Sequence, residues 1–399
     1  MSLLAPGIPL SLYIHLPWCV EKCPYCDFNS HQLNDQFDET KYVASLLKDL
    51  EQDLPKIWGR AVETIFIGGG TPSLFSGPAI DELISGVRAR LMLRADLEIT
   101  LESNPGTADA QNYLNYRQAG VNRLSIGVQS FDDQQLKILG RIHDASQAVD
   151  AFQMARDAGF KRINIDLMYA LPAQSIEDAL KDLDKAIALD PEHISWYQLT
   201  IEPNTTFNRY PPKQLPDDDL IWEIQQAGAK KLQEAGFTQY EISAWSKKSE
   251  QCQHNVNYWE FGDYLGIGAG AHGKITDLSN EKIYRTRRRK QPSHWLDDKM
   301  NFLADAPAIE KTDLPLEFMM NAMRLNSGVS ISTFTERTGL LISDIMEPLR
   351  KARNNNLMDT RLDILKPTPQ GLNYLNDLLA LFMDVKITQT NDIVIKEIT

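Results

Sequence analysis

Short apolar runs alternate with longer amphipathic stretches along the first half of the chain. The short runs are rich in β-branched and aromatic side chains, which is typical of buried strands. The amphipathic stretches repeat apolar residues at helical spacing, and several begin at Asp or Ser, which cap helices well. This pattern predicts six strand–helix units. The predicted strands are residues 11–16, 64–69, 97–102, 123–128, 162–167 and 193–198, and the predicted helices include residues 38–54, 78–93, 145–158 and 176–189.

Strands that alternate with helices pair in parallel, so the sequence predicts an α/β fold with either an open doubly wound sheet or a partial barrel. The carboxyl ends of parallel strands form one rim, and polar residues stand where these strands end. Asp166 lies among apolar neighbours, where a charge is costly to bury, and indicates either a binding role or a structural ion pair. The other polar residues at the rim are Gly68, Gly69, Gly70, Thr71, Glu102, Gln129 and Gln198.

The second half of the chain is organised differently. Alternating residues at 239–243 and 264–271 predict further strands beside the sheet. Helical patterns, a hairpin-like stretch at 357–365 and a last helix after Pro369 then follow in an order that resembles a winged-helix domain. The helical patterns cover residues 315–325, 331–338 and 343–354. We expect three parts, namely a barrel at 1–240, its extension at 241–309 and a C-terminal domain at 310–399.

Composition and charge exclude several classes of protein. Hydrophobic residues make up 43% and charged residues 24% of the chain, and no apolar run is long enough to span a membrane. The net charge is −13, and residues 310–399 hold ten Lys or Arg against twelve Asp or Glu, so nucleic-acid binding is not expected. Because a nucleic-acid role is not expected, the sequence favours a packing or lid role for the C-terminal domain. A basic cluster at 285–290 is either a solvated segment or a contact for a local partner.

The amino-terminal segment lacks the basic and then apolar order of a signal peptide, so we expect a cytosolic protein. In a reducing compartment, clustered cysteines are metal ligands more often than disulfide partners. Cys19, Cys23 and Cys26 can bind three irons of a [4Fe–4S] cluster and leave the fourth iron without a protein ligand. A structural zinc site, with His15 or His31 as the fourth ligand, is the alternative.

The cysteine motif at the end of a first strand, with the glycine-rich loop after the second, resembles the radical S-adenosylmethionine (SAM) superfamily. The resemblance implies a partial (β/α)6 barrel with added strands and a SAM molecule chelated to the open iron through its amino and carboxylate groups. The cluster can then supply an electron that splits the sulfonium. The glycine loop implies backbone contacts where a side chain would block the methionine part of SAM. Read alone, the three glycines are no more than a turn.

Within that superfamily, YIHLPWCVEKCPYCDF, GGGTPS, GVQSF and LGRIH resemble the oxygen-independent coproporphyrinogen III oxidases and their relatives. The aromatic residues Trp18, Tyr25 and Phe28 fit either a shell around a redox centre or part of the core, and Tyr25 is counted with the cofactor-binding residues. The resemblance implies that Tyr13 lies beside the SAM sulfonium and that Glu102 lies near the amino group. It also implies that Gly69, Gly70 and Thr71 lie along the methionine part of SAM. The residues that it implies for the carboxylate and the ribose are Gln129, Arg141 and Asp166.

Two features depart from the oxidases. Phe28 occupies the position of their fourth cysteine, and only about a dozen residues precede the first strand, where the oxidases have a longer segment. The hexapeptide 254–259, HNVNYW, matches the HNxxYW signature of the HemW branch of haem chaperones. His254 is then a haem ligand, with Tyr258 and Trp259 against the macrocycle. Read alone, the hexapeptide is a turn packed under the barrel, and Cys252 is either a second ligand or a buried thiol.

The sequence therefore favours a haem chaperone that carries a [4Fe–4S] cluster with SAM. Its expected partners are haem, acceptor haemoproteins with respiratory ones among them, and an electron donor for the cluster. We expect a monomer or homodimer without an integral membrane segment, in the cytoplasm or peripheral at the inner membrane face. The alternatives are coproporphyrinogen III oxidase activity and another radical reaction on an unidentified substrate.

Overall fold

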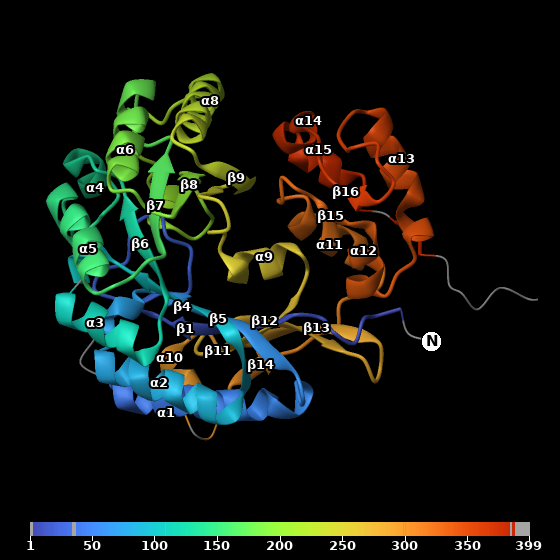
Figure 1. The fold of residues 1–399 in the computed structure, drawn as a ribbon, viewed down its shortest axis with the longest axis horizontal. Coiled ribbons are helices and arrows are strands. Elements are labelled where there is room, and N and C mark those ends of the chain that lie inside the picture. The colour runs from blue at the N-terminus through green and yellow to red at the C-terminus, as the bar shows by residue number, and fades with distance from the viewer. Residues whose placement is uncertain are drawn as a thin grey trace, which may run out of the picture.

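The computed structural model describes residues 3–33, 37–107, 109–297, 299, 301–383 and 385–387. Its centre is a mixed sheet of twelve strands in the order β14-β13-β12-β11-β1-β4-β5-β6-β7-β8-β10-β9. The six predicted strands are adjacent and parallel within it, and the sheet is curved but not closed (Figure 1). The fold is therefore the predicted partial barrel. These strands are β1 (Leu10–Leu16), β4 (Ala61–Gly69), β5 (Met92–Ser103), β6 (Arg123–Gln129), β7 (Ile163–Tyr169) and β8 (His193–Gln198).

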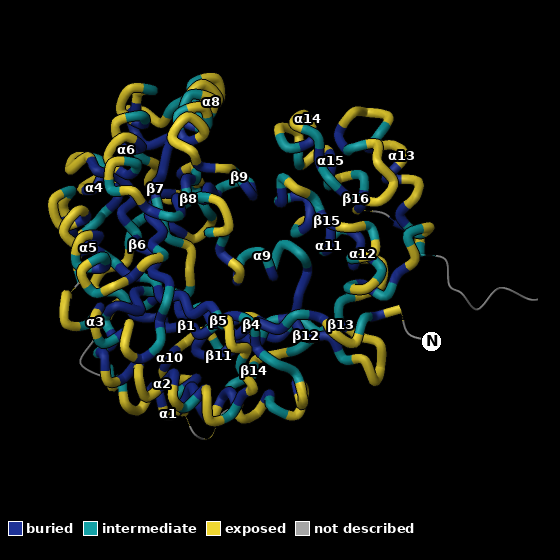
Figure 2. Tube along the Cα trace, viewed as in Figure 1, coloured by how far each residue is buried: buried dark blue, intermediate teal, exposed yellow. Residues whose placement is uncertain are grey.

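Helices cover the outer face of the parallel strands (Figure 1). Asp38, Ser76, Asp144 and Ser175 each accept a backbone N–H at the start of one of the four predicted helices, which confirms the capping signal in the sequence. Figure 2 shows the strands as mostly buried and the outer faces of the helices as exposed. The covering helices are α1 (Glu39–Asp53), α2 (Gly77–Arg90), α3 (Ala110–Ala119), α4 (Asp133–Ile138), α5 (Ala145–Asp157), α6 (Ile176–Ala188) and α8 (Asp218–Glu234).

Additional strands extend the sheet at both edges, as the alternating residues predict. β11 (Asp263–Ile267) pairs in parallel with β1, so its carboxyl end reaches the same rim. The antiparallel strands beyond it are β12 (His272–Asp277), β13 (Lys282–Arg288) and β14 (Leu303–Asp305), and those at the other edge are β10 (Ala244–Ser246) and β9 (Thr238–Glu241). Short elements are β2 (Trp18–Cys19), β3 (His31–Gln32), α7 (Thr206–Arg209), α10 (Pro292–Trp295), and the 3-10 turns Leu54–Lys56, Pro72–Leu74 and Pro105–Thr107.

Helix α9 (Gln253–Trp259) carries the whole HNVNYW hexapeptide and lies on the inner side of the sheet, where it packs on β4, β1 and β11 (Figure 1). The rim of the barrel lies on one side of α9, and the C-terminal helices lie on the other. The helix has seven residues, so positions four apart share a face.

The C-terminal region forms a second hydrophobic core that also includes Tyr240, Ala244, Phe261 and Ile283 from the edge of the barrel. The predicted hairpin at 357–365 is only partly present: β16 (Ile364–Leu365) pairs with β15 (Val329–Ser330), and a single bridge joins Met358 to Pro367. The apolar pattern identified the strand but not its partner. The helical elements here are α11 (Leu314–Ala322), α12 (Ile331–Thr338), the 3-10 turn Ile342–Ile345, α13 (Met346–Asn354), α14 (Pro369–Asn373) and α15 (Leu375–Ala380).

No helix in the described ranges is both long and apolar enough to cross a membrane.

Candidate functional site

A cavity of about 490 Å³ opens at the rim of the barrel. The cysteine loop that follows β1 forms one wall, and all three of its cysteines are half-buried free thiols. Of the residues predicted to hold the cluster and SAM, all except Tyr13 line this cavity. They are Cys19, Cys23, Tyr25, Cys26, Gly69, Gly70, Thr71, Glu102, Gln129, Arg141 and Asp166.

The glycine loop is packed tightly against the end of β1. A Cβ atom on Gly70 would lie 2.5 Å from the carbonyl oxygen of Trp18, and one on Gly69 would lie 2.6 Å from the His15 ring. Gly69 also has a φ of +119°, which favours glycine. These glycines are therefore required by the protein's own packing. The sequence-based reason, room for the methionine part of a ligand, stays a prediction.

Two carboxylates line the cavity from β5 and β7, the strands on either side of β6. Glu102 accepts the backbone N–H of Gly69 at 3.0 Å, and Asp166 accepts the Ser125 hydroxyl at 3.0 Å and the Asn164 amide at 2.8 Å. Burial, with a further contribution from Asp166, raises the pKa of Glu102 to about 7, and burial also raises the pKa of Asp166. Asp166 has no salt-bridge partner among the described residues, and a carboxylate that accepts one or two hydrogen bonds keeps lone pairs for a cationic or hydroxyl-bearing ligand.

Arg141 and Gln129 line the same cavity as these carboxylates. Arg141 donates to the carbonyl oxygen of Gly127 at 2.7 Å and to the Cys23 sulfur at 3.6 Å, while its buried Nε has no partner in the described part of the chain. Gln129 accepts the Tyr197 hydroxyl at 2.6 Å and has a φ of +71°, an uncommon backbone conformation that often marks functional positions. An unpaired guanidinium N–H beside the cysteines fits a ligand carboxylate.

The C-terminal region closes the far end of the same cavity. Arg324 follows α11, forms an ion pair with Glu241 at 2.9 Å and lies 4.4 Å above the Trp259 ring. Arg324 Nε, Trp259 Nε1 and Asn326 Oδ1 are buried polar atoms without a partner among the described residues. Buried polar atoms without partners are rare in native proteins and are commonly satisfied by a ligand or water. This wall therefore fits a polar ligand group.

A second cavity, of about 840 Å³, adjoins the first. Cys26, Phe28, Ser30, Gly69 and Glu102 line both. Tyr13 lines this second cavity, and its hydroxyl group forms a hydrogen bond with His15 Nδ1 at 2.9 Å. Tyr13 therefore lines the cavity that adjoins the one lined by the other predicted residues. The remaining walls come from the β11–β12 connection and α9.

His254 lies in neither cavity. It is buried, and its ring nitrogens contact Thr64 Oγ1 and the Tyr258 hydroxyl, each at 2.8 Å. Burial lowers the pKa of His254 to about 3, so the ring is neutral. Its neighbours in the hexapeptide divide between the cavities: Asn255 and Trp259, four residues apart, line the first, and Tyr258 lines the second. A role for His254 as a haem ligand stays a prediction.

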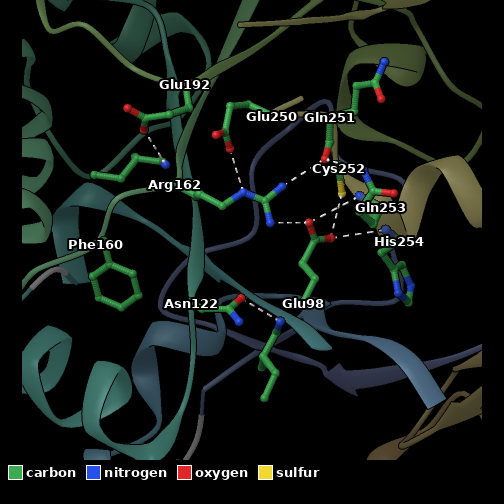
Figure 3. Close-up of polar contacts among 12 residues, drawn as sticks. Glu98, Asn122, Phe160, Arg162, Glu192, Glu250, Gln251, Cys252, Gln253 and His254 are labelled. Carbon is green, nitrogen blue, oxygen red and sulfur yellow. Dashed lines mark hydrogen bonds and ion pairs between the residues drawn. The ribbon is translucent and has the colours of Figure 1, made fainter. Parts of the chain in front are cut away.

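Glu98 on β5 fixes the start of α9 (Figure 3). Its carboxylate accepts the backbone N–H groups of His254 at 3.2 Å and Gln253 at 3.3 Å, and pairs with Arg162 at 2.9 Å. Cys252, which precedes the helix, is buried 3.8 Å from the same carboxylate, and burial raises its pKa to about 11. Cys252 lines neither cavity, which favours the buried-thiol interpretation.

The zinc alternative needed a histidine beside the cysteines. Both ring nitrogens of His15 are engaged, by Tyr13 and by the carbonyl oxygen of Asn29, and His31 Nε2 lies 3.3 Å from the carbonyl oxygen of Lys290. These contacts occupy both ring nitrogens of His15 and Nε2 of His31. Within the described ranges, no group of three His, Cys, Asp or Glu side chains is arranged to hold a single metal ion.

Most basic side chains of the cluster at 285–290 form ion pairs or hydrogen bonds within the protein. Arg288 is buried between Asp49 and Asp53, and Arg287 pairs with Asp305. Arg285 contacts Glu317 and the Tyr264 hydroxyl, and Arg289 donates to the Asn301 carbonyl oxygen. Lys290, which is exposed, lines the second cavity.

Several cavity residues were not predicted from the sequence. Ser125, Ser195 and Tyr197 lie two or four positions from predicted residues or from each other on β6 and β8, so strand alternation could have identified them. Glu241 ends β9 at the edge of the sheet and carries no local signal, and only the packing of the C-terminal region on the barrel brings Arg324 to the cavity.

The fold and the site define a radical SAM protein. The chain matches the radical SAM superfamily over residues 13–186 and the HemN C-terminal domain over residues 309–373. The solved structure of coproporphyrinogen III oxidase (HemN) from Escherichia coli aligns with a TM-score of 0.80 over 94% of this chain and 90% of that one. At 24% identity, that similarity concerns the fold.

Sequence comparison identifies the branch. The chain is 51% identical to the heme chaperone HemW of Escherichia coli over 94% of its own length and 98% of the relative, and 48% identical to that of Haemophilus influenzae over 94% and 98%. It is also 37% identical to the mouse mitochondrial radical S-adenosyl methionine domain-containing protein 1, over 80% and 74%. The chain therefore belongs to the HemW family, which confirms the resemblance drawn from its motifs.

Proposed function

We propose that this chain is a haem chaperone, which binds a [4Fe–4S] cluster and SAM in the first cavity, binds haem, and transfers the haem to acceptor haemoproteins. One observation carries the cofactor part of the proposal. Apart from Tyr13, the residues predicted for the cluster and SAM come from five strands and three loops, yet they line a single cavity with three free thiols in one wall.

Cys19, Cys23 and Cys26 are the cluster ligands in this proposal. The cluster supplies an iron with an open position and an electron at low potential when it is bound. The unpaired Nε of Arg141 suits the SAM carboxylate, and Glu102 and Asp166 suit its amino group and ribose hydroxyls. Gly69, Gly70, Thr71, Gln129 and Tyr25 complete the first cavity, and Tyr13 lines the adjoining one.

Haem binding and transfer rest on the family. Curated relatives across nearly the whole chain carry the name heme chaperone, and the hexapeptide of that branch lies on α9, between the two cavities. Acceptor haemoproteins, with respiratory ones among them, and an electron donor are the partners of this proposal. The parts 1–240, 241–309 and 310–399 serve as barrel, extension with α9, and closing domain.

An anaerobic titration tests the haem part. Full-length protein with a reconstituted cluster is titrated with haem, and the expected result is a shifted, saturable Soret band. The complex is then mixed with an apo-haemoprotein, to which the haem should move. A protein that shows no saturable Soret shift, or that keeps its haem in the presence of the acceptor, contradicts the proposal.

The oxidase alternative is tested on the same preparation. Coproporphyrinogen III, SAM and a reductant are added, and protoporphyrinogen is measured. Phe28, whose side chain is 63% exposed between the two cavities, stands where the oxidases carry a cysteine, so we expect no turnover. Clear formation of protoporphyrinogen would replace the chaperone proposal with the oxidase.

A further inference from the structure

A haem-binding site needs aromatic or apolar walls, cationic groups for the two haem carboxylates and an accessible iron ligand. We propose that the second cavity is the haem-binding site, with His272 as the axial iron ligand and Lys290 as the partner of a haem carboxylate. This proposal rests on the haem-binding function proposed above. His254, inside the hexapeptide, then acts as a positioning residue for the cavity wall.

The size and position of the cavity suit a macrocycle. Its volume of about 840 Å³ lies in the range of roughly 300–1,000 Å³ that is usual for small-molecule and cofactor sites. The cavity shares Cys26, Gly69 and Glu102 with the first one, so its contents would lie next to the cluster and SAM. A haem bound here would therefore lie adjacent to the cofactors.

Three tyrosine rings line this cavity, and the hydroxyl group of each is hydrogen-bonded to a neighbouring side chain. Tyr258 is bonded to His254 Nε2 at 2.8 Å, Tyr13 to His15 Nδ1 at 2.9 Å, and Tyr264 accepts from Arg285 at 2.9 Å. The Tyr258 and Tyr264 rings also meet edge to face, with centroids 4.4 Å apart. Hydroxyl groups that are already bonded leave ring surface for an apolar ligand and fix its shape in advance.

Among the histidines that line a cavity, His272 alone has both ring nitrogens unbonded, as far as the described residues show, whereas His31 is bonded through Nε2 only. The rings of His15, His31, His143, His193 and His254 all have hydrogen-bond partners, and His294 lines neither cavity. His272 is exposed, lines the second cavity, and its ring takes part in no hydrogen bond or ion pair with any residue that the structure describes. An imidazole nitrogen with a free lone pair is the common axial ligand of haem iron.

The topology explains why His272 reaches this place. It is the first residue of β12, directly after the turn that follows β11, and β11 runs parallel to β1. The turn is tied to the cysteine loop, because Asn29 donates to the carbonyl oxygens of Ala269 at 3.0 Å and Lys290 at 2.9 Å. His272 and Lys290 therefore belong to a wall with a fixed position.

Lys290 supplies the cation. Its ammonium group has no hydrogen-bond or ion-pair partner within the described ranges, whereas Lys22, on the same cavity, is bonded to the Phe28 and Ser30 carbonyl oxygens. The carboxylates of haem would pair with Lys290 at the open side of the cavity. An exposed ion pair of this kind contributes modestly, so Lys290 affects affinity less than the iron ligand does.

The test compares His272→Ala, His254→Ala and His294→Ala in the full-length protein with its cluster. We expect His272→Ala to lose the spectrum of histidine-ligated haem and to bind haem about tenfold more weakly or worse, and free imidazole to restore the spectrum. His294→Ala, an exposed control on α10, should leave spectrum and affinity unchanged. His254→Ala should keep the ligation spectrum and weaken affinity only through Tyr258.

A second comparison uses Lys290→Gln with haem and with its dimethyl ester. The variant should weaken binding of haem and leave binding of the ester unchanged, because the ester has no carboxylate to pair. Far-ultraviolet circular dichroism checks the folding of His272→Ala and Lys290→Gln. We expect both variants to fold normally, because the two side chains are exposed. A His272→Ala protein with the parental spectrum and affinity overturns the assignment, and loss of the spectrum in His254→Ala instead supports the hexapeptide histidine. A parent that binds no haem overturns the proposed function itself.

Discussion

The anchoring of α9 by Glu98 leads to a quantitative prediction. In Glu98→Gln, the side chain keeps its size and loses its charge, while Gln253, His254 and Arg162 lose an anionic partner. Glu98 is 3% exposed, so solvent cannot replace that partner. We expect the substitution to destabilise the folded protein rather than to rearrange it.

The magnitude follows from the three contacts. A hydrogen bond to a charged group is worth about 1 kcal/mol more than one to a neutral group, and two backbone N–H groups point at this carboxylate. Arg162 is 25% exposed and keeps its second partner, Glu250, so the lost ion pair contributes only about 1 kcal/mol. The expected loss in the free energy of unfolding is about 3 kcal/mol.

Urea unfolding followed by tryptophan fluorescence measures the total loss, and hydrogen–deuterium exchange measures the local effect on α9. Glu250→Gln is the matched control, because it removes the other carboxylate of Arg162, which is 31% exposed, and should cost no more than about 1 kcal/mol. The reasoning is refuted if the two variants are equally stable and the amides of α9 exchange as slowly in Glu98→Gln as in the parent.

Three further predictions concern the cofactor cavity and acid stability. Cys26→Ala should lose the iron and visible absorbance of the reconstituted cluster, whereas Cys252→Ala, outside both cavities, should keep them; equal iron contents would contradict the proposed ligand set. Gly70→Ala should lower the thermal midpoint sharply because its Cβ would lie 2.5 Å from a carbonyl oxygen, whereas Gly7→Ala, with nothing within 4 Å, should not. The pKa of His254 is about 3 when folded against 6.5 unfolded, so its stabilisation is complete above pH 6.5 and is lost as pH falls toward 3. Between pH 6.5 and 5 this loss is about 2 kcal/mol, and His254→Gln should have a correspondingly flatter urea midpoint over that interval.

Much of the barrel could be predicted from the sequence, because burial imposes a regular pattern on strands and outer helices. The six parallel strands appear where the apolar runs lie, and the ends of these strands bring Glu102, Gln129 and Asp166 into one cavity. The segment 357–365 shows the limit of that pattern. Apolar alternation indicates that a strand forms, whereas the choice of Val329–Ser330 as its partner depends on packing within the C-terminal core.

The hexapeptide could not be resolved into roles from its sequence. Read as a line of letters, HNVNYW presents His254 beside Tyr258 and Trp259 as one haem-binding surface. Folded as a helix, it turns Asn255 and Trp259 toward one cavity and Tyr258 toward the other, and it buries His254 against β4. The rotation of about 100° per residue separates neighbours in the sequence.

The position of Arg324 has a consequence for how such proteins can be recombined. A side chain that follows α11 forms one end of the cofactor cavity, so the C-terminal domain supplies part of the chemistry of the barrel. A chimaera that exchanged this domain between two relatives would also exchange the residue opposite Trp259 and Glu241. The junction of such a hybrid therefore has to be judged by the cavity it rebuilds, and good folding of each half is insufficient.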